Sequence, residues 1–252
     1  MEDQDGASGR RGFLGLLGAA ASAAALVGCG RRRSPSEPSG EQPVPTDRMT
    51  YRVDPHTGKR VSLLGYGCMR LPRRPKADAM GDSELIDQEA VNASVDYALA
   101  HGINYFDTSP RYCKGRSERA MGLALGRHPR DSYLVATKMS NFAAQSREES
   151  LAMYRQSMKD LGVDFFDYYL VHAVGKYEGY KARFLDNGVL DFLIKEREAG
   201  RIRNLGWSFH GESAFFDYMM SSGVKWDFVQ IQANYFDWNT AQGSSNVNAK
   251  YL

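Results

Sequence analysis

From about residue 50 onward, short apolar runs alternate with longer stretches in which apolar residues recur at helical spacing. Short apolar runs bounded by turn residues predict strands. Two strands, residues 50–53 and 60–64, flank a turn-rich segment at residues 54–58 and predict a hairpin. Six further strands are predicted at residues 62–66, 104–107, 132–137, 168–172, 204–208 and 228–234.

The stretches between these runs predict amphipathic helices with recognisable ends. Residues 83–102 run from Ser83, a good N-cap, to Gly102, which favours a helix end. Residues 146–162 begin with a capping box, Ser146 and Glu149, and end at Gly162. Further helices are predicted at residues 117–125, 189–199 and 212–222.

This alternation of strands and helices predicts an α/β protein with a parallel sheet. A doubly wound sheet usually carries a glycine-rich phosphate loop after its first strand, and residues 64–68 do not supply one. A hairpin followed by β/α units is typical of a (β/α)8 TIM barrel. Six units are visible where eight are needed, so residues 49–252 are expected to form an incomplete barrel that lacks strands seven and eight.

The N-terminal residues have the pattern of an export signal. Arg10 and Arg11 precede an uncharged stretch at residues 13–28, which is too short to span a membrane but suits a signal of the Tat type. Residues 26–29 resemble a lipobox that ends at Cys29. We therefore expect a signal peptide at residues 1–29, a disordered proline-rich tether at residues 30–48, and a periplasmic protein or membrane-anchored lipoprotein.

Charge and cysteine content exclude several classes of protein. The chain has 32 basic and 30 acidic residues, which argues against nucleic-acid binding driven by a basic surface. Three cysteines without metal-ligand spacing predict neither a disulfide framework nor a metal site. Contact with a membrane is expected only through a lipid on Cys29, and the sequence does not indicate an oligomeric state.

Ionisable residues follow three successive predicted strands. Asp107 ends the strand at residues 104–107, Lys138 follows the next, and His172 ends the one after that, while Tyr112 lies in the loop after Asp107. In a barrel, the C-terminal ends of the strands face the active site. Each residue alone has an ordinary structural explanation, such as a solvated loop or a helix cap. Their combination predicts a common site.

Together these four side chains suit proton transfer to a reacting oxygen. A nearby ammonium favours a phenolate, so Lys138 is expected to lower the pKa of Tyr112. Asp107 provides the counter-charge that keeps the amine protonated. His172 is expected to orient a carbonyl oxygen and to relay the proton. The group thus suits protonation of an oxygen that becomes negative as hydride arrives at its carbon.

At this point the sequence resembles the aldo-keto reductase family. The five-residue step from Asp107 to Tyr112, and steps of 31 and 34 residues to Lys138 and His172, are similar to the spacing in that family. The resemblance implies that Tyr112 is the general acid/base, that Lys138 and Asp107 tune it, and that His172 positions the carbonyl. The matching segments are residues 64–67, 106–112, 117–118, 137–138 and 170–172.

The resemblance also implies a nicotinamide cofactor, NADP or NAD, and a small carbonyl or alcohol substrate. Ser208 matches the serine that holds the nicotinamide carboxamide, and Gln230 matches a glutamine with the same task, although Gln232 shares its strand face. Residues 64–72 are similar to an exported branch that often carries a ferredoxin-like cysteine cluster after the barrel. This chain has no ligands for an iron–sulfur cluster, which is expected only in a longer form.

The sequence therefore predicts an exported, NAD(P)-dependent oxidoreductase of aldo-keto reductase type, truncated after strand six. Two alternatives remain open at this point. One is a catalytically idle, lipid-tethered barrel that acts as a binding or scaffold subunit. The other is a truncated fragment without function of its own.

Overall fold

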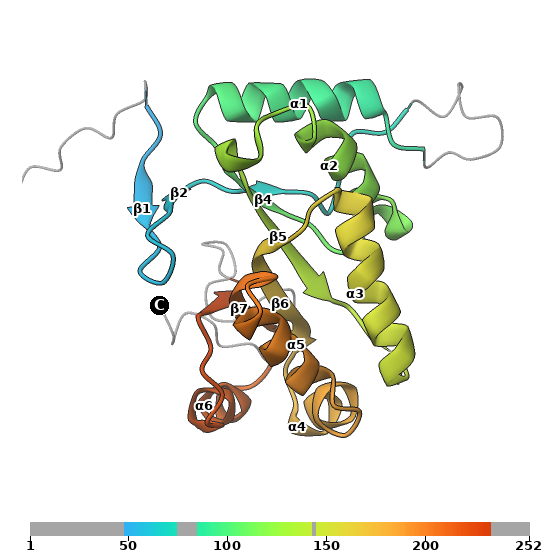
Figure 1. Cartoon of the computed structure of the whole chain (residues 1–252), viewed down its shortest axis with the longest axis vertical. Coiled ribbons are helices and arrows are strands. Elements are labelled where there is room, and N and C mark those ends of the chain that lie inside the picture. Colours follow the sequence, from blue (N-terminus) through green and yellow to red (C-terminus); the bar gives the residue numbers. More distant parts are fainter. Residues whose placement is uncertain (1–47, 75–84, 143–144, 233–252) are drawn as a thin grey trace, which may run out of the picture. The chain divides into compact units, whose positions relative to one another are not determined.

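The computed structural model describes residues 48–74, 85–142 and 145–232. Its main element is a six-stranded parallel sheet with the strands in chain order (Figure 1). This curled sheet with its helices matches a (β/α)8 barrel over the part described, which confirms the predicted fold class. The strands are β3 (Tyr66–Gly67), β4 (Tyr105–Asp107), β5 (Leu134–Met139), β6 (Phe166–Val174), β7 (Ile202–Phe209) and β8 (Phe228–Ile231).

The predicted hairpin is confirmed as an antiparallel pair, β1 (Tyr51–Val53) and β2 (Arg60–Ser62). Asp54 in its turn accepts hydrogen bonds from the Tyr168 hydroxyl and from Asn204 Nδ2, so the turn contacts the N-terminal parts of β6 and β7.

The predicted strand at residues 62–66 is wrong in its extent. Ser62 belongs to the hairpin, and its N–H donates to Asn104 Oδ1 at 2.8 Å instead of to a strand. The Ser62 hydroxyl then donates to the Leu64 carbonyl at 2.7 Å. The chain turns here, so the first strand of the parallel sheet is only the two residues of β3.

Helices follow the strands as the sequence predicts. They are α1 (Gln88–Ala100), α2 (Ser117–Leu125), α3 (Arg147–Leu161), α5 (Val189–Glu198) and α6 (Ser213–Ser221). A short α4 (Tyr177–Tyr180) and a π-helical turn, η4 (Lys181–Leu185), lie between β6 and α5 and were not predicted.

The helix ends follow local capping chemistry. The capping box of Ser146 and Glu149 is present at the start of α3, and Gly162 ends that helix at φ 65°. Gly102, after α1, has φ 84°, where a Cβ is disfavoured. The predicted start of α1 is wrong, because the helix begins at Gln88 with Asp87 as its N-cap. Ser83 lies outside the described residues.

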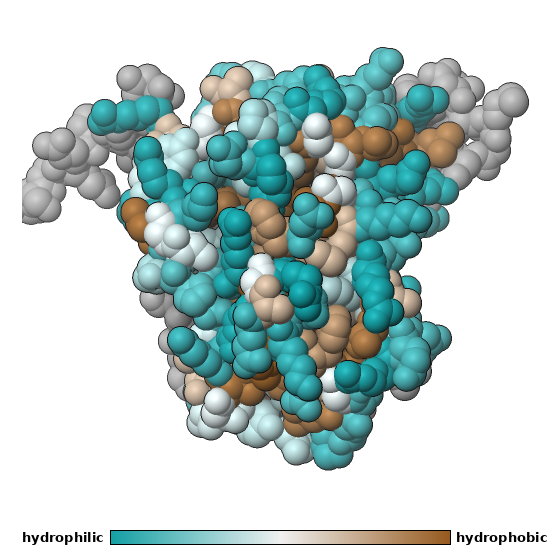
Figure 2. Space-filling view, viewed as in Figure 1, coloured by the Kyte–Doolittle hydropathy of each residue, from teal (hydrophilic) through white to brown (hydrophobic). Residues whose placement is uncertain are grey.

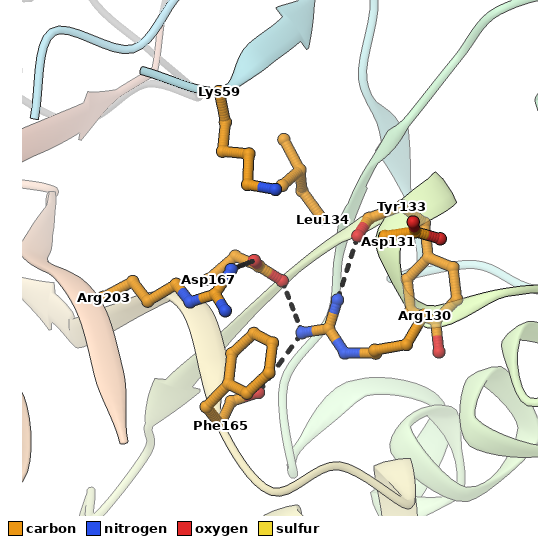
Figure 3. A pocket seen from close by; sticks show the side chains of 8 residues that line it. All are labelled: Lys59, Arg130, Asp131, Tyr133, Leu134, Phe165, Asp167 and Arg203. Carbon is orange, nitrogen blue, oxygen red and sulfur yellow. Dashed lines mark hydrogen bonds and ion pairs between the residues drawn. The ribbon is translucent and has the colours of Figure 1, made fainter. Parts of the chain in front are cut away.

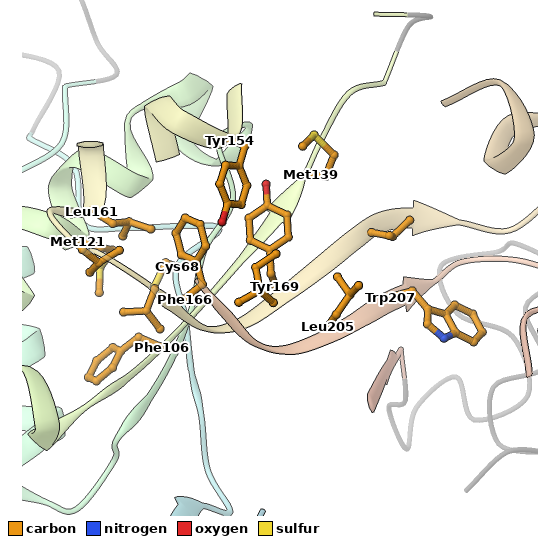
Figure 4. Packing of buried hydrophobic residues seen from close by; sticks show 14 of the residues in the cluster. Cys68, Phe106, Met121, Met139, Tyr154, Leu161, Phe166, Tyr169, Leu205 and Trp207 are labelled. Atoms are coloured by element: carbon orange, nitrogen blue, oxygen red, sulfur yellow. The ribbon is translucent and has the colours of Figure 1, made fainter. Parts of the chain in front are cut away.

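Side chains alternate between the two faces of the sheet. The outer face packs against the helices, and Figure 4 shows Tyr154 of α3 beside Tyr169 of β6 and beside Phe166 at the start of that strand. The Tyr154 ring centroid lies 5.4 Å from that of Phe166 and 5.2 Å from that of Tyr169. The inner face carries a smaller apolar cluster, whose buried members are Leu134, Ala136, Tyr168 and Leu170.

The face of the molecule shown in Figure 2 is largely hydrophilic, with apolar side chains in scattered groups. Within the described ranges, no helix has the length and apolar character needed to cross a bilayer. The predicted signal peptide, nearly all of the tether, and residues 233–234 of the last predicted strand lie outside the described residues.

Candidate active site

The alternation of side chains brings the predicted site residues to one face and one end of the sheet. Lys138 lies two residues beyond Ala136 of the inner cluster, and His172 lies two residues beyond Leu170. Ser208 of β7 is the register partner of Gln230 of β8. Because the strands are parallel, these residues meet at the C-terminal ends of their strands.

A cavity of about 180 Å³ lies at this end of the sheet. Five of the six predicted site residues line it, and the sixth, Asp107, contacts Lys138 directly. The lining residues are Tyr112, Lys138, His172, Ser208, His210, Gln230, Ile231 and Gln232. The sequence-predicted group is therefore brought together in space.

Lys138 and Asp107 form a buried ion pair. The distance from Lys138 Nζ to Asp107 Oδ1 is 2.5 Å, and Nζ also donates to the Thr108 carbonyl at 2.8 Å. The Lys138 side chain is 2% exposed. Burial lowers the pKa of Lys138, and the Asp107 carboxylate opposes this by favouring the ammonium.

Tyr112 begins a short 3-10 turn, Tyr112–Gly115, in which Cys113 and Lys114 have left-handed φ angles of 50° and 54°. Lys138 Nζ lies 4.9 Å from the centroid of the Tyr112 ring. The Tyr112 and His172 ring centroids are 6.0 Å apart, with the rings at 81° to each other. The turn therefore holds the phenol ring against both the amine and the imidazole.

The pKa of Tyr112 differs from the expectation. Burial raises it, and the charge of Asp107 raises it further, so the predicted lowering by Lys138 is wrong for the protein without ligands. The physical reason is the loss of hydration on burial, together with the Asp107 carboxylate, which lies 2.5 Å from the ammonium and opposes its effect on the phenol. Tyr112 is consequently a protonated phenol at neutral pH.

His172 is a neutral imidazole. Burial lowers its pKa to about 2, and the positive charges of Lys138 and Arg183 act in the same direction. The neutral ring can orient an oxygen, and the relay of a proton through His172 stays a prediction. Its Nδ1 atom lies 2.5 Å from the Ser140 hydroxyl.

A local irregularity of β6 orients His172. The register with β7 shifts between Val171 and Val174, and Ala173 has a left-handed φ of 48°. Arg183 donates to the carbonyl of His172 at 2.7 Å and to that of Ala173 at 3.3 Å. The Ser208 hydroxyl accepts the Ala173 N–H at 2.7 Å. These contacts hold the bulge that carries His172.

Gln230 and Gln232 differ in their position relative to Ser208. Gln230 pairs in register with Ser208, whereas Gln232 lies beyond the end of β8. Both side chains line the cavity. The geometry favours Gln230 as the amide beside Ser208.

Sequence reasoning missed Ser140, Arg183 and His210. Ser140 had a usable signal, because it lies two residues after Lys138 and so on the same face of the chain. Arg183 had none, since it comes from the unpredicted turn η4 and reaches the site only in three dimensions.

A second pocket, of about 270 Å³, lies near the N-terminal ends of β5, β6 and β7 (Figure 3). There the Asp167 carboxylate lies 2.6 Å from Arg130 and 3.3 Å from Arg203, and it also accepts the Val135 N–H. The carboxylate is thus already neutralised and hydrogen-bonded. In barrels of this type, the N-terminal end of the strands serves stability.

Curated proteins of similar sequence are known. The sequence is 30% identical over 201 residues to Protein tas of Escherichia coli, covering 66% of this chain and 53% of that protein. It is 32% identical over 175 residues to L-galactose dehydrogenase of Arabidopsis thaliana, covering 63% and 48%. The chain thus spans about half the length of these curated relatives.

The fold has matching solved structures. One is an aldo-keto reductase from Bacillus halodurans in its holo form, with a TM-score of 0.57, 25% identity, and coverage of 73% of this chain and 58% of that one. Another, from Brucella melitensis, has a TM-score of 0.54 at 24% identity and covers 73% and 63%. The sequence model of the aldo/keto reductase family matches residues 63–250. The chain therefore belongs to the aldo/keto reductase family.

Proposed function

We propose that this chain is an NAD(P)-dependent oxidoreductase that interconverts a small carbonyl compound and its alcohol, with Tyr112 as the proton donor and acceptor. One observation carries the proposal: a phenol, an ammonium, an imidazole, a hydroxyl and an amide line the same cavity. Membership of a family of oxidoreductases supports it, as does the name of the relative that is an L-galactose dehydrogenase.

The state of each group favours reduction. Tyr112 is protonated at neutral pH, and the alkoxide formed in reduction is far more basic than a phenolate, so the phenol can donate its proton. The Lys138 ammonium, 4.9 Å from the centroid of the ring, then offsets part of the cost of the phenolate that results, although it does not reverse the effect of burial. His172 is neutral and donates a hydrogen bond to the same substrate oxygen.

The donor set fits a nicotinamide carboxamide, which has one carbonyl and one amino group. The Gln230 side chain offers the complementary donor and acceptor. The Ser208 oxygen already accepts the Ala173 N–H, which leaves its hydroxyl proton for a carbonyl oxygen. When bound, the cofactor would supply or accept the hydride. NADP and NAD are not distinguished by these residues.

Titration and turnover test the proposal together. NADPH and NADH are titrated by fluorescence quenching, and reduction of small aldehydes and ketones is followed at 340 nm. We expect Tyr112→Phe to keep the Kd of the cofactor and to lower kcat by about 10²–10⁴-fold, the usual contribution of general acid–base catalysis. Tyr177→Phe, at a partly exposed tyrosine of α4, serves as the control and keeps full activity.

Two results would contradict the proposed activity. Failure of both cofactors to bind would reject the proposal and favour the alternative of an idle barrel that serves as a binding or scaffold subunit. Full turnover in Tyr112→Phe would reject the assigned role of Tyr112.

We also propose that the protein is exported and anchored to the membrane by a lipid on Cys29. The support is in the sequence: Arg10 and Arg11 before an uncharged stretch, and the lipobox at residues 26–29. Labelling with a fatty acid, followed by fractionation, tests it. We expect Cys29→Ala to lose the label and to leave the membrane fraction, and Arg10→Lys with Arg11→Lys to block export. An unlabelled wild-type protein would reject the anchor.

A further inference from the structure

Two buried serines lie beside His172 and are not among the residues that line the cavity. The Ser140 hydroxyl is 2.5 Å from His172 Nδ1, and the Ser109 hydroxyl is 2.9 Å from that of Ser140. Both serines are fully buried, and His172 is 8% exposed. The function proposed above gives these serines no task.

The direction of these hydrogen bonds follows from a count of protons. The backbone N–H of Arg111 donates to the Ser109 oxygen at 3.2 Å, so the Ser109 proton is available for Ser140. Ser140 in turn has one proton and two acceptors, His172 Nδ1 at 2.5 Å and the Lys138 carbonyl at 3.4 Å. The second distance lies beyond the usual range for an O–H donor, so the proton goes to Nδ1.

The reverse direction satisfies the group less well. If Nδ1 carried the hydrogen and donated to Ser140, the Ser140 proton would need Ser109 or the Lys138 carbonyl. Donation to Ser109 would leave the Ser109 proton without an acceptor among the hydrogen bonds of the described part of the chain. Donation to Lys138 would rely on the 3.4 Å contact. A buried polar group left without a partner carries a substantial free-energy cost.

The position of the single ring proton matters because His172 is neutral. Burial together with the charges of Lys138 and Arg183 keeps its pKa at about 2, so only one ring nitrogen carries a hydrogen. With the hydrogen on Nε2, the ring donates to a substrate oxygen. With the hydrogen on Nδ1, Nε2 would instead present a lone pair to that oxygen and compete for the Tyr112 proton.

We propose that Ser140, held in place by Ser109, is a positioning residue that fixes His172 as the tautomer with the hydrogen on Nε2. The inference rests on the proposed function, in which His172 orients the substrate oxygen. Ser140 acts through His172 and contacts neither substrate nor cofactor. The Ser140 hydroxyl has this effect because it donates its hydrogen bond to His172 Nδ1.

Nitrogen NMR tests this without any turnover. The protein is labelled with ¹⁵N-histidine, and His172 is assigned by the loss of its signals in His172→Gln. In wild type at neutral pH, we expect the ¹⁵N chemical shift of Nδ1 to be that of a nitrogen without a hydrogen, and the shift of Nε2 to be that of a nitrogen that carries one. Ser140→Ala is expected to move a measurable fraction to the other tautomer, and Ser140→Thr to restore the wild-type shifts.

Kinetics give a second readout. We expect Ser140→Ala to lower kcat by about tenfold, the equivalent of one well-placed hydrogen bond, with the Kd of the cofactor unchanged. Ser109→Ala, which leaves Ser140 in place, should shift the tautomer in the same direction. It is also the substitute if Ser140→Ala does not fold. Ser221→Ala, at the end of α6, is the matched control and should leave the His172 shifts unchanged.

Two results would overturn the inference: a hydrogen on Nδ1 in wild type, or His172 shifts that are the same in wild type, Ser140→Ala and Ser109→Ala. Failure of the proposed function looks different. In that case the wild-type tautomer and its response to the serine variants would be as expected, while Tyr112→Phe would have no effect on turnover or neither cofactor would bind.

Discussion

Replacing Glu118 by Gln removes an ionisable group from the core. Glu118 lies in α2 and is 2% exposed. Its Oε1 accepts the Thr137 hydroxyl at 2.5 Å, and its Oε2 accepts the Ser157 hydroxyl at 3.0 Å. Burial raises its pKa from 4.5 to about 7, because two hydroxyl donors do not replace the hydration of a carboxylate.

The raised pKa makes stability depend on pH in a defined direction. Between pH 4.5 and 7, the folded chain retains a proton on Glu118 that the unfolded chain has lost. Stability therefore falls as pH rises through this window and then stays level. The interval of about 2.5 pH units corresponds to about 3 kcal/mol at 1.4 kcal/mol per unit.

Urea unfolding at pH 5 and pH 8 measures this effect. We expect the free energy of unfolding of Glu118→Gln, minus that of wild type, to be larger at pH 8 than at pH 5 by about 2.5 kcal/mol, because part of the window lies below pH 5. The comparison with wild type cancels every other titrating group. Glu198→Gln, at the exposed end of α5, is the control and should show no such difference.

A difference between wild type and Glu118→Gln that is the same at both pH values would refute the reasoning. It would mean that Glu118 ionises alike in the folded and the unfolded chain. The hydroxyls of Thr137 and Ser157 would then fully replace the water lost on burial.

Three further predictions concern the site. Because burial raises the pKa of Tyr112, kcat for carbonyl reduction should be level from pH 6 to 9. In alcohol oxidation, which needs the phenolate, kcat should increase by up to about tenfold for each unit by which the pH is raised. A kcat for oxidation that is independent of pH would contradict this. In Gly206→Ala, the new Cβ would lie 2.5 Å from the Phe228 carbonyl oxygen and displace β8. We expect a loss of about 1–3 kcal/mol in thermal unfolding and weaker cofactor binding, and an unchanged Tm would argue against it. Arg183→Met leaves the carbonyls of His172 and Ala173 without their donor, so the free energy of unfolding should fall by about 1–3 kcal/mol. The same substitution removes a nearby cation, so the pKa of His172 should rise. Histidine titration by NMR measures that shift, and a fall in the pKa would contradict the reasoning.

The sequence by itself determined most of the local structure and six of the residues at the candidate site. Short apolar runs predicted five of the six parallel strands close to their observed positions, because the central strands β5, β6 and β7 are buried on both faces and so are apolar almost throughout. Capping residues such as Ser146 and Gly162 marked both ends of α3, since they act on the backbone beside them. Strand ends placed Asp107, Lys138 and His172 together because parallel strands share one C-terminal edge.

Only the tertiary structure decided how these groups behave. The pKa of Tyr112 rises instead of falling, because burial and the compensation of Lys138 by Asp107 outweigh the attraction that spacing alone suggests. His172 is neutral because it is buried, and the nearby charges of Lys138 and Arg183 lower its pKa further. Desolvation and the direction of hydrogen bonds depend on contacts between residues far apart in the chain, and periodicity and spacing do not encode them.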